Sequence, residues 1–354
     1  MSEQFVGITE VTEKNRFVVS RLEDYMKRNI EGFDGRIDVH QFKGGQSNPT
    51  YLISSGKKKF VLRRKPPGKL LPSAHAVDRE YRVISALQST DVPVPKTYCL
   101  CKDESILGTM FYIMEHVEGR VLWDQTLPDL SPSERNDIYR EQNRVIANLH
   151  LVDYKALGLE DFGKPGNYID RQIRRWTKQY RASETEEIKE MEQLIEWLPQ
   201  NIPQSEEFGL VHGDYRLDNL IFHPEKPEIL AILDWELSTL GHPLADFSYH
   251  CMYWKLTRSQ FRGIGGEDLD SLGIPNEKEY IRMYCQQTHR DDIENWSFYT
   301  AYNMFRLAAI CQGIMGRFKD GTAASKHAEE QGKKARPLAK AGWTQVVRMI
   351  EEGT

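Results

Sequence analysis

Two short apolar runs in the second half of the chain flank polar residues that a hydrophobic core would not choose. The loop before the first run (220–222) carries Asp214 and Asn219, and the second run (229–233) ends at Asp234. A hairpin of the two runs would bring both polar groups to the same end of a small sheet. Phosphoryl transfer needs a carboxylate that accepts the proton of the attacking hydroxyl and oxygen ligands that hold Mg²⁺ against the phosphates. These residues therefore indicate phosphoryl-transfer chemistry.

The spacing of these side chains strengthens that interpretation. With His212 included, Asp214, Asn219 and Asp234 reproduce the pattern H-x-D-x-x-x-x-N…D of kinases. Arg216 stands two residues after Asp214, where it could neutralise the transferred phosphate. The alternative is a set of exposed turn residues, because Asp and Asn favour turns. That alternative is reasonable for any one of them but explains the whole set between two strands poorly.

The same residues resemble a known family. In the aminoglycoside phosphotransferase and choline kinase group, within the protein-kinase-like fold, the catalytic loop reads H-G-D and the metal triplet reads D-W-E or similar. Here those segments are 212–214 and 234–236, and the later run 241–246 also looks like that of the group.

The resemblance implies a role for each matching residue. Asp214 would be the catalytic base, and Asn219 and Asp234 would bind Mg²⁺. His212 would brace the catalytic loop, and Asp246 would hydrogen-bond the backbone of that loop. The implied cofactors are ATP and Mg²⁺.

The order of the expected elements indicates the fold class. Residues 35–118 contain about five strand-like runs, among them 37–42, 51–54, 59–64 and 110–117. They also contain one helix around Tyr81, Ile84 and Leu87. After Gly119 the pattern becomes mostly helical. We therefore expect an α+β, protein-kinase-like bilobal fold, with an N-terminal antiparallel sheet carrying one helix and a larger, mostly helical C-terminal lobe.

The chain length fits two lobes, since single hydrophobic cores stop growing at roughly 250–300 residues. We expect a nucleotide-binding N-terminal lobe at 1–117 and a C-terminal lobe at 118–354 with the catalytic loop and the acceptor site. A helical insertion at 151–208 precedes the catalytic loop, as in small-molecule kinases of this group.

A kinase also needs a cation on the phosphates and a carboxylate that orients it. Arg63 ends the strand-like run 59–64, where the family places a lysine and the choline kinase branch tolerates arginine. Arg64 is the alternative, and Glu80 in the next helix is the expected ion-pair partner. Glu115 and Val117, at the junction of the lobes, are expected to meet the adenine through backbone groups.

The expected phosphate loop lies between two strands but is not G-x-G-x-x-G. Its candidate nucleotide-binding residues are Gly44, Gly45, Gln46 and Ser47. Two adjacent glycines are also typical of an ordinary hairpin turn. The sequence of this loop is often degenerate in small-molecule kinases. The departure therefore weakens the assignment of nucleotide contacts more than it weakens the inferred kinase function.

Composition excludes several classes of protein. The 354 residues are 40% hydrophobic with a net charge of −5, which argues against a nucleic-acid partner. The five cysteines form no C-x-x-C pair, so disulfide scaffolds and structural zinc are not expected. We see no signal peptide and no apolar stretch near the roughly 20 residues of a membrane span. We expect a cytoplasmic protein without a membrane partner, and the sequence leaves the oligomeric state open.

The insertion carries a basic stripe at helical spacing. Its members are Arg171, Arg174, Arg175 and Lys178. A solvated helix face is the ordinary explanation. The functional alternative is a clamp for an anionic acceptor.

Two further residues are candidate acceptor contacts. Arg306 lies in an otherwise apolar helix, and a buried guanidinium needs a partner, either structural or the substrate itself. Glu236 closes the D-W-E triplet. The segments expected to line the pocket are basic and aromatic, whereas a polycationic aminoglycoside needs carboxylates.

Residues 62–83 resemble the kinase-like domain fused to large eukaryotic acyl-CoA dehydrogenases and its free-standing bacterial relatives, and this resemblance covers nearly the whole chain, to 336–343. That resemblance suggests a hydroxylated acyl acceptor, as a free acid or a CoA thioester. Alternatives are an aminoglycoside- or choline-type kinase and an inactive kinase-like nucleotide-binding module. A metal-dependent hydrolase would need more metal ligands at tight spacing, and a protein kinase would need the missing A-P-E segment.

Overall fold

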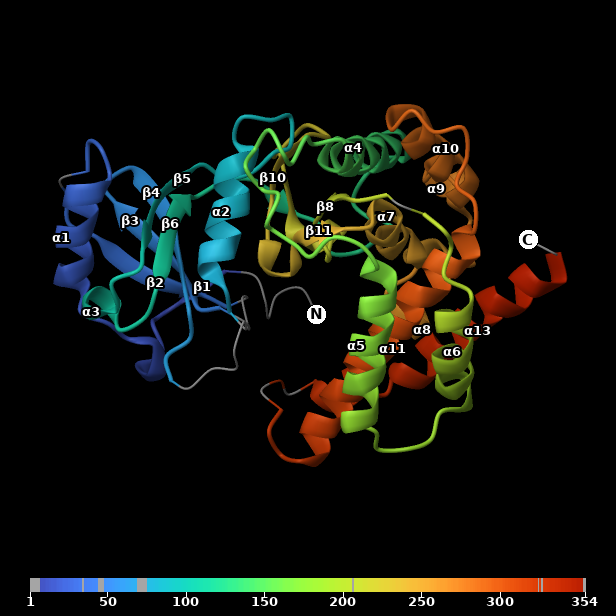
Figure 1. Cartoon of the computed structure of the whole chain (residues 1–354). Helices are drawn as coiled ribbons and strands as arrows, with labels where there is room; N and C mark the ends of the chain where they lie inside the picture. Colours follow the sequence, from blue (N-terminus) through green and yellow to red (C-terminus); the bar gives the residue numbers. More distant parts are fainter. Residues whose placement is uncertain are drawn as a thin grey trace. The chain divides into compact units, whose positions relative to one another are not determined.

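The chain folds into two compact units, which are described separately. The computed structural model describes residues 7–33, 35–43, 48–68, 75–205, 207–323, 325 and 327–352. The first unit consists of Met1–Trp123, Lys155–Leu159 and Asp218–Ser238. The second unit consists of Asp124–Tyr154, Glu160–Leu217 and Thr239–Thr354. The first unit thus includes a segment, Asp218–Ser238, that the expected division placed in the C-terminal lobe. Figure 1 shows the elements coloured along the sequence.

A six-stranded antiparallel sheet forms the centre of the first unit. In spatial order its strands are β1 (Ile8–Thr9), β2 (Asp38–Phe42), β3 (Thr50–Ser55), β4 (Lys58–Arg64), β6 (Phe111–Glu115) and β5 (Thr97–Cys101). Every neighbouring pair is antiparallel, which confirms the expected sheet. The runs expected at 37–42, 51–54, 59–64 and 110–117 are strands within one or two residues. Strands β1 and β5 were not among the named runs.

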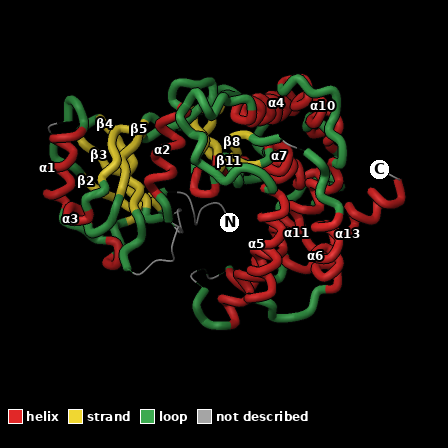
Figure 2. Tube along the Cα trace, viewed as in Figure 1, coloured by secondary structure: helices red, strands yellow, loops and turns green. Residues whose placement is uncertain are grey.

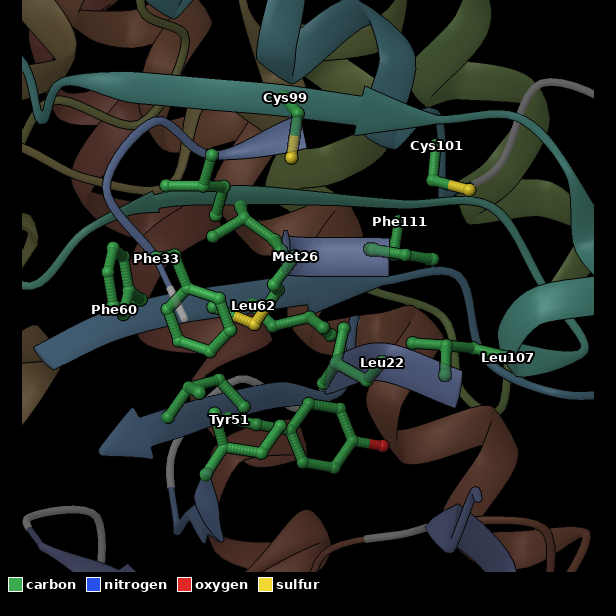
Figure 3. Packing of buried hydrophobic residues seen from close by; sticks show 14 residues of the cluster. Leu22, Met26, Phe33, Tyr51, Phe60, Leu62, Cys99, Cys101, Leu107 and Phe111 are labelled. Atoms are coloured by element: carbon green, nitrogen blue, oxygen red, sulfur yellow. The ribbon is translucent and has the colours of Figure 1, made fainter. Parts of the chain in front are cut away.

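One face of this sheet is covered by helix α1 (Val19–Asn29), which the sequence patterns did not predict. Leu22 and Met26 lie one turn apart on α1 and are fully buried. They join a cluster that includes Phe60 and Leu62 of β4, as Figure 3 shows. Burying each such side chain contributes roughly 1.5–3 kcal/mol, so this cluster fixes which residues of β4 point toward α1.

The opposite face carries helix α2 (Val77–Leu87), the helix expected around Tyr81. Successive side chains of a strand point to opposite faces. Since Phe60 and Leu62 point toward α1, Val61 and Arg63 point toward α2. Arg64 points into the α1 side, where its guanidinium lies 5.5 Å from the ring centroid of Phe17. The register of β4 therefore separates the two candidate cations.

A small three-stranded sheet completes the first unit. Its spatial order is β10 (Ile229–Ile232), β9 (Leu220–Phe222) and β7 (Arg120–Val121). Strands β9 and β10 form the expected antiparallel hairpin. The backbone N–H of Leu233 donates to the carbonyl of Asn219 at 2.8 Å, so Asn219 and Asp234 lie at the same end of the hairpin.

Short elements connect these parts of the first unit. They are η2 (Glu13–Asn15), α3 (Glu104–Leu107) and η4 (Trp235–Leu237). The 3-10 turn η3 (Leu217–Asn219) leads directly into β9. Its first residue, Leu217, ends the segment Glu160–Leu217 of the second unit, and its other two residues belong to the first unit. The metal-ligand candidates thus sit on turns that begin or end strands of the small sheet.

The second unit is mostly helical, as Figure 2 shows. Its longer helices are α4 (Pro132–His150), α5 (Tyr168–Ala182), α6 (Lys189–Gln200), α7 (Pro243–Cys251), α10 (Glu277–Gln287), α11 (Trp296–Lys319) and α13 (Ala335–Glu352). Its shorter elements are β8 (Gly209–Val211), β11 (Thr239–Gly241), η5 (Met252–Trp254), α8 (Arg258–Phe261), α9 (Leu269–Leu272) and α12 (Ala328–Gly332). Strands β8 and β11 pair antiparallel.

Local sequence explains where these helices begin. Ser131 and Glu134 form a capping box at the start of α4, with Pro132 in the first turn. Helix α7 begins in a similar way, because the His242 side chain accepts from the N–H of Leu244 and Pro243 follows the cap. None of the helices in the described ranges is long and apolar enough to cross a membrane.

Helix α11 organises the packing of the second unit. It is apolar on most sides, which is typical of a buried helix, and it packs against α5, α7 and α13. The amide of Asn303 donates to the Ala245 carbonyl and the Ser248 hydroxyl, both at 2.8 Å. These bonds fix α7, all of whose residues are buried, against α11.

Candidate active site

The first unit contains a buried arginine that bridges two carboxylates. The Arg63 Nε lies 2.7 Å from Glu80 Oε2, and one terminal nitrogen donates to Asp234 Oδ1 at 2.6 Å. Glu236 Oε2 is 3.8 Å from the same nitrogen. Burial opposes the charge of Arg63, but Glu80 and Asp234 outweigh it and raise the pKa of the guanidinium above its ordinary value. Arg63 therefore stays charged and ties β4 to α2 and to the turn after β10.

Glu80 is held by side chains that the sequence patterns did not identify. The amide of Asn48 donates to Glu80 Oε1 at 2.8 Å, and the Tyr112 hydroxyl donates to Oε2 at 3.1 Å. His75 Nδ1 lies 3.0 Å from the amide oxygen of Asn48. Asn48 is the last residue of the expected phosphate loop, 44–48, although it was not among the candidate binding residues; its place in that loop is the signal that could have identified it. The residues Gly44, Gly45, Gln46 and Ser47 themselves lie outside the described residues.

The metal-ligand candidates follow the hairpin of the small sheet. Asp234 adopts a left-handed backbone with φ 64° and stands at the start of η4. Such a conformation is uncommon for a residue other than glycine and favours Asp or Asn. The side chain of Asp234 is about one-third exposed at 33%, whereas Asn219 is buried. Carboxylate and amide oxygens of this kind are the donors that Mg²⁺ prefers.

In the second unit, residues 212–214 form a tight loop between β8 and the 3-10 turn. Gly213 has φ +84°, a left-handed backbone that glycine adopts without a steric cost. Asp246 of α7 accepts the N–H of His212 at 2.7 Å and the N–H of Gly213 at 2.8 Å. His212 Nδ1 accepts the N–H of Asp214 at 3.2 Å. The backbone bonds expected of Asp246 are therefore present.

Asp246 has a second support that sequence reasoning missed. His150 Nε2 lies 3.3 Å from Asp246 Oδ2, and His150 Nδ1 lies 2.7 Å from the Tyr284 hydroxyl. Burial opposes ionisation of Asp246, but the hydrogen bonds from His150 and from the backbone of His212 lower its pKa below the ordinary value. Asp246 thus remains a carboxylate that accepts hydrogen bonds in the core.

The Asp214 carboxylate is held from two sides. Arg216 Nε donates to Oδ2 at 3.1 Å, and the Tyr249 hydroxyl donates to Oδ1 at 2.6 Å. Tyr249 is buried on α7, one helical turn after Asp246. Arg216 thus contacts the carboxylate within its own loop, while Tyr249 was not among the predicted residues. The i, i+3 spacing of Asp246 and Tyr249 is the signal that could have identified it.

Arg306 of α11 meets the same loop from another direction. One terminal nitrogen donates to the Gly213 carbonyl at 2.6 Å. The guanidinium carbon lies 5.0 Å from the ring centroid of Tyr249 and 5.7 Å from that of Trp176. Across the described residues no carboxylate pairs with Arg306, and its Nε has no hydrogen-bond acceptor. The sequence left two alternatives for the partner of Arg306, a structural group or the substrate. The structure shows structural partners, which are a backbone carbonyl and two aromatic rings and not an Asp.

The basic stripe of α5 divides into residues with different partners. Arg171 donates to the carbonyls of Lys164 and Gly166, which tie it to the loop before the helix. Arg174 pairs with Asp170 at 2.9 Å and is exposed. Arg175 is also exposed, with its guanidinium 5.4 Å from the Trp176 ring. Arg174 and Arg175 thus remain accessible to a ligand.

The expected adenine contacts lie at the end of β6. The backbone N–H of Glu115 donates to the Lys96 carbonyl at 2.7 Å, which joins β6 to the segment before β5. The Glu115 carboxylate accepts the N–H of Lys96 at 3.3 Å. Val117 follows two residues later, after the strand has ended. The first unit thus fixes Glu115 rigidly, and its role toward adenine stays a prediction.

Fold and sequence together define the class of protein. The family model described as the phosphotransferase enzyme family, APH, matches residues 38–280, which is more than half of the chain. The chain belongs to this family. The resemblance and the fold class predicted from the sequence are thereby confirmed.

Solved structures give the same result. A putative aminoglycoside phosphotransferase from Ralstonia eutropha JMP134 is 56% identical with a TM-score of 0.88, and the match covers 94% of this chain and 99% of that one. Choline kinase from Cryptosporidium parvum Iowa II is 13% identical with a TM-score of 0.65, and the match covers 95% and 97%. A thermostable aminoglycoside phosphotransferase APH(4)-Ia, solved with ADP and hygromycin B, is 14% identical with a TM-score of 0.59, and the match covers 93% and 98%. The last two share the fold.

Curated relatives match almost all of this chain but are much longer. Acyl-CoA dehydrogenase family member 10 of Mus musculus is 50% identical over 91% of this chain and 30% of its own length. Probable acyl-CoA dehydrogenase IBR3 of Arabidopsis thaliana is 42% identical over 96% of this chain and 44% of its own length. The chain thus spans less than half the length of these relatives.

Proposed function

We propose that the chain is an ATP- and Mg²⁺-dependent phosphotransferase that acts on the hydroxyl group of a small molecule. The observation that carries the proposal is Arg63, which bridges Glu80 and Asp234 while almost fully buried. Kinases hold the nucleotide phosphates with a cation on a central strand, paired to a helical glutamate and placed beside a metal-binding aspartate. A basic surface turn would not bury this set of charges.

The proposed roles are assigned within each unit separately. Asp214 accepts the proton of the acceptor hydroxyl, and Arg216, which already contacts its carboxylate, stabilises the transferred phosphate. His212 and Asp246 hold the loop that carries Asp214. We assign nucleotide binding to the expected N-terminal lobe, 1–117, and acceptor binding to the C-terminal lobe, 118–354, including the insertion 151–208.

The donor chemistry fits the proposed cofactors. Asn219 and Asp234 offer only oxygen donors to a metal, and three carboxylates surround one guanidinium, which leaves an excess of negative charge. The described residues contain no cluster of three or more His, Cys, Asp or Glu that could hold a metal. Mg²⁺ needs none, because it binds through one or two carboxylates together with substrate phosphates. When bound, it would neutralise charge on the nucleotide phosphates of ATP.

The acceptor in this proposal is an anionic hydroxy compound, either a hydroxy acid or a hydroxyacyl-CoA. Arg174 and Arg175 are exposed basic side chains on the insertion, and Arg306 forms no ion pair with a carboxylate of the described residues. The matched relatives are named as acyl-CoA dehydrogenases, which favours an acyl acceptor. Glu236 beside Arg63 is a candidate contact for the acceptor hydroxyl. The buried free thiols of all five cysteines fit a reducing compartment such as the cytoplasm.

A panel assay tests the proposal. The purified chain is incubated with Mg²⁺ and ATP, and ADP release is measured with hydroxy acids, hydroxyacyl-CoA thioesters, choline and aminoglycosides. We expect turnover with hydroxylated acyl compounds and a fall of about 10²- to 10⁴-fold for Asp214→Asn. Asp137→Asn, an exposed aspartate of α4, is the matched control and leaves the rate unchanged.

Other outcomes would point to other functions. Turnover with choline or aminoglycosides alone would overturn the acyl acceptor but keep the phosphotransferase. ADP binding without turnover on any acceptor would support an inactive nucleotide-binding module. Activity that survives removal of Mg²⁺ by a chelator would contradict the metal assignment of Asn219 and Asp234.

A further inference from the structure

Helix α7 contacts the catalytic loop through two side chains that lie one helical turn apart. Asp246 accepts the backbone N–H groups of His212 and Gly213, and Tyr249 donates to the side chain of Asp214. Residues three apart on a helix share a face, so one rigid face of α7 holds both the backbone and the carboxylate of the loop. This helix is fully buried, which limits its freedom to shift.

The Tyr249 hydroxyl can act only as a donor here. Its partner is a carboxylate, which offers acceptors alone. Burial and the neighbouring Asp214 charge raise the pKa of Tyr249 well above its ordinary value, so the phenol keeps its proton. The 2.6 Å bond therefore fixes Asp214 Oδ1 at one place, while Arg216 fixes Oδ2.

Arg306 in turn fixes Tyr249 and the loop backbone. Its guanidinium lies 5.0 Å from the centre of the Tyr249 ring and donates to the Gly213 carbonyl. A cation over an aromatic face attracts the ring, and more strongly where water is excluded. Both residues are buried, and α11, which carries Arg306, is bonded to α7 through Asn303. Arg306 thus connects the position of the tyrosine to that of the loop.

We propose that Tyr249 and Arg306 are positioning residues for Asp214, which together hold its carboxylate toward the acceptor hydroxyl. This inference rests on the proposed function, in which Asp214 is the catalytic base. It adds Tyr249 to the site, and it gives Arg306, also considered above as a contact for an anionic acceptor, a second role that acts through the base.

The first test removes one hydroxyl. Tyr249→Phe keeps the ring under Arg306 and deletes the donor to Asp214. We expect kcat to fall about 10- to 100-fold, because small misplacements of a catalytic group have effects of this size. The KM for ATP stays unchanged, because Tyr249 lies in the second unit and not in the Arg63 cluster. Tyr139→Phe is the matched control, since this buried phenol of the same unit donates to the Gln125 carbonyl and not to a residue of the catalytic loop.

A double-mutant cycle separates positioning from general stability. In an Asp214→Asn background, Tyr249→Phe should cause almost no further loss of kcat, because the base through which it acts is gone. An equal loss in both backgrounds would overturn the proposal. Arg306→Lys should keep more of kcat than Arg306→Met, since lysine retains the charge beside the ring.

A structural measurement decides the inference even if no acceptor is turned over. In crystal structures we expect the Asp214 side chain to occupy one conformer in the wild type and to leave that place, or to split between conformers, in Tyr249→Phe. An unchanged Asp214 in Tyr249→Phe would overturn the positioning role. A wild type without turnover on the whole panel, with Asp214 displaced in the variant, would instead contradict the proposed function alone.

Discussion

Two buried arginines, one in each unit, show opposite ways of keeping a charge inside a protein. Arg63 is surrounded by the carboxylates of Glu80, Asp234 and Glu236 within 4 Å. Arg306 meets a backbone carbonyl and two aromatic rings, and no carboxylate of the described residues pairs with it. Their exposed fractions are nearly equal, at 8% and 7%. Burial alone therefore does not decide how a buried charge is compensated.

The difference predicts what each arginine does. Around Arg63 the carboxylates outnumber the cation, so this region favours a further cation such as Mg²⁺ and depends on Arg63 for its own stability. Around Arg306 no carboxylate of the described residues forms an ion pair, and the nearby Asp214 keeps Arg216 as its partner if Arg306 is removed. A residue in the second setting can orient a loop without being essential to the fold. The following predictions test this contrast, from the largest expected effect to the smallest.

Removal of Arg63 should have the largest effect. In Arg63→Ala, the buried Glu80 loses its ion-pair partner, and stranding one charge of a buried pair costs about 3–5 kcal/mol. Urea unfolding measures this loss, and Arg63→Lys serves as the control that keeps the charge. A loss below about 1 kcal/mol, as for surface pairs, would remove the distinction between the two arginines.

Acid pH should act mainly on the second unit. Burial lowers the pKa of His250 from 6.5 to about 3, although Asp246 opposes the shift. Between pH 3 and 6.5 the unfolded chain therefore binds one more proton than the folded chain, so stability falls as pH falls through this range. One such group contributes about 1.4 kcal/mol per pH unit.

The measurement for this prediction is urea unfolding at several pH values. Between pH 4 and 6, His250→Gln should reduce the slope of stability against pH by about 1.4 kcal/mol per unit, because glutamine does not titrate. His242, whose pKa burial lowers to about 4, acts in the same direction. An unchanged slope in His250→Gln would show that protons reach this helix without unfolding it.

Removal of Arg306 should destabilise the chain less than removal of Arg63. Arg306→Met breaks no ion pair, but it leaves the Gly213 carbonyl without its donor, and an unsatisfied buried acceptor costs about 1–3 kcal/mol. We expect kcat to fall about 10-fold through the loss of loop positioning. If Arg306→Met destabilised the chain as much as Arg63→Ala, the two environments would be energetically alike.

The smallest effect is expected on the exposed face of α5. Arg174 pairs with Asp170 one turn earlier, and such exposed pairs contribute about 0.5 kcal/mol or less. Arg174→Gln should therefore leave the free energy of unfolding nearly unchanged. The same variant should raise the KM of an anionic acceptor if Arg174 contacts it, and Arg348→Gln, at an exposed position of α13, is the control for a general charge effect.

Much of the candidate site followed from local sequence. In the segment from Leu210 to Glu236, acidic and amide residues stand at fixed spacing before and after short apolar strands. A hairpin of such strands brings their ends together without help from distant parts of the chain. The capping box at Ser131 likewise fixed the start of α4. Helix α1 and strand β5 were not predicted. Helix α1 buries Leu22 and Met26 in a mostly polar sequence, and the burial of both elements depends on partners distant in the sequence.

The sequence by itself determined the family, the hairpin that carries Asn219 and Asp234, and the choice of Arg63 or Arg64 as candidates. The tertiary structure decided between the two arginines. Neighbouring side chains of β4 point to opposite faces of the sheet, and which face meets Glu80 is known only once α1 and α2 have packed on those faces. It also decided that Tyr249 holds Asp214, since that bond joins residues 35 positions apart. Short-range spacing fixes local geometry, whereas contacts between distant segments exist only after the chain has packed.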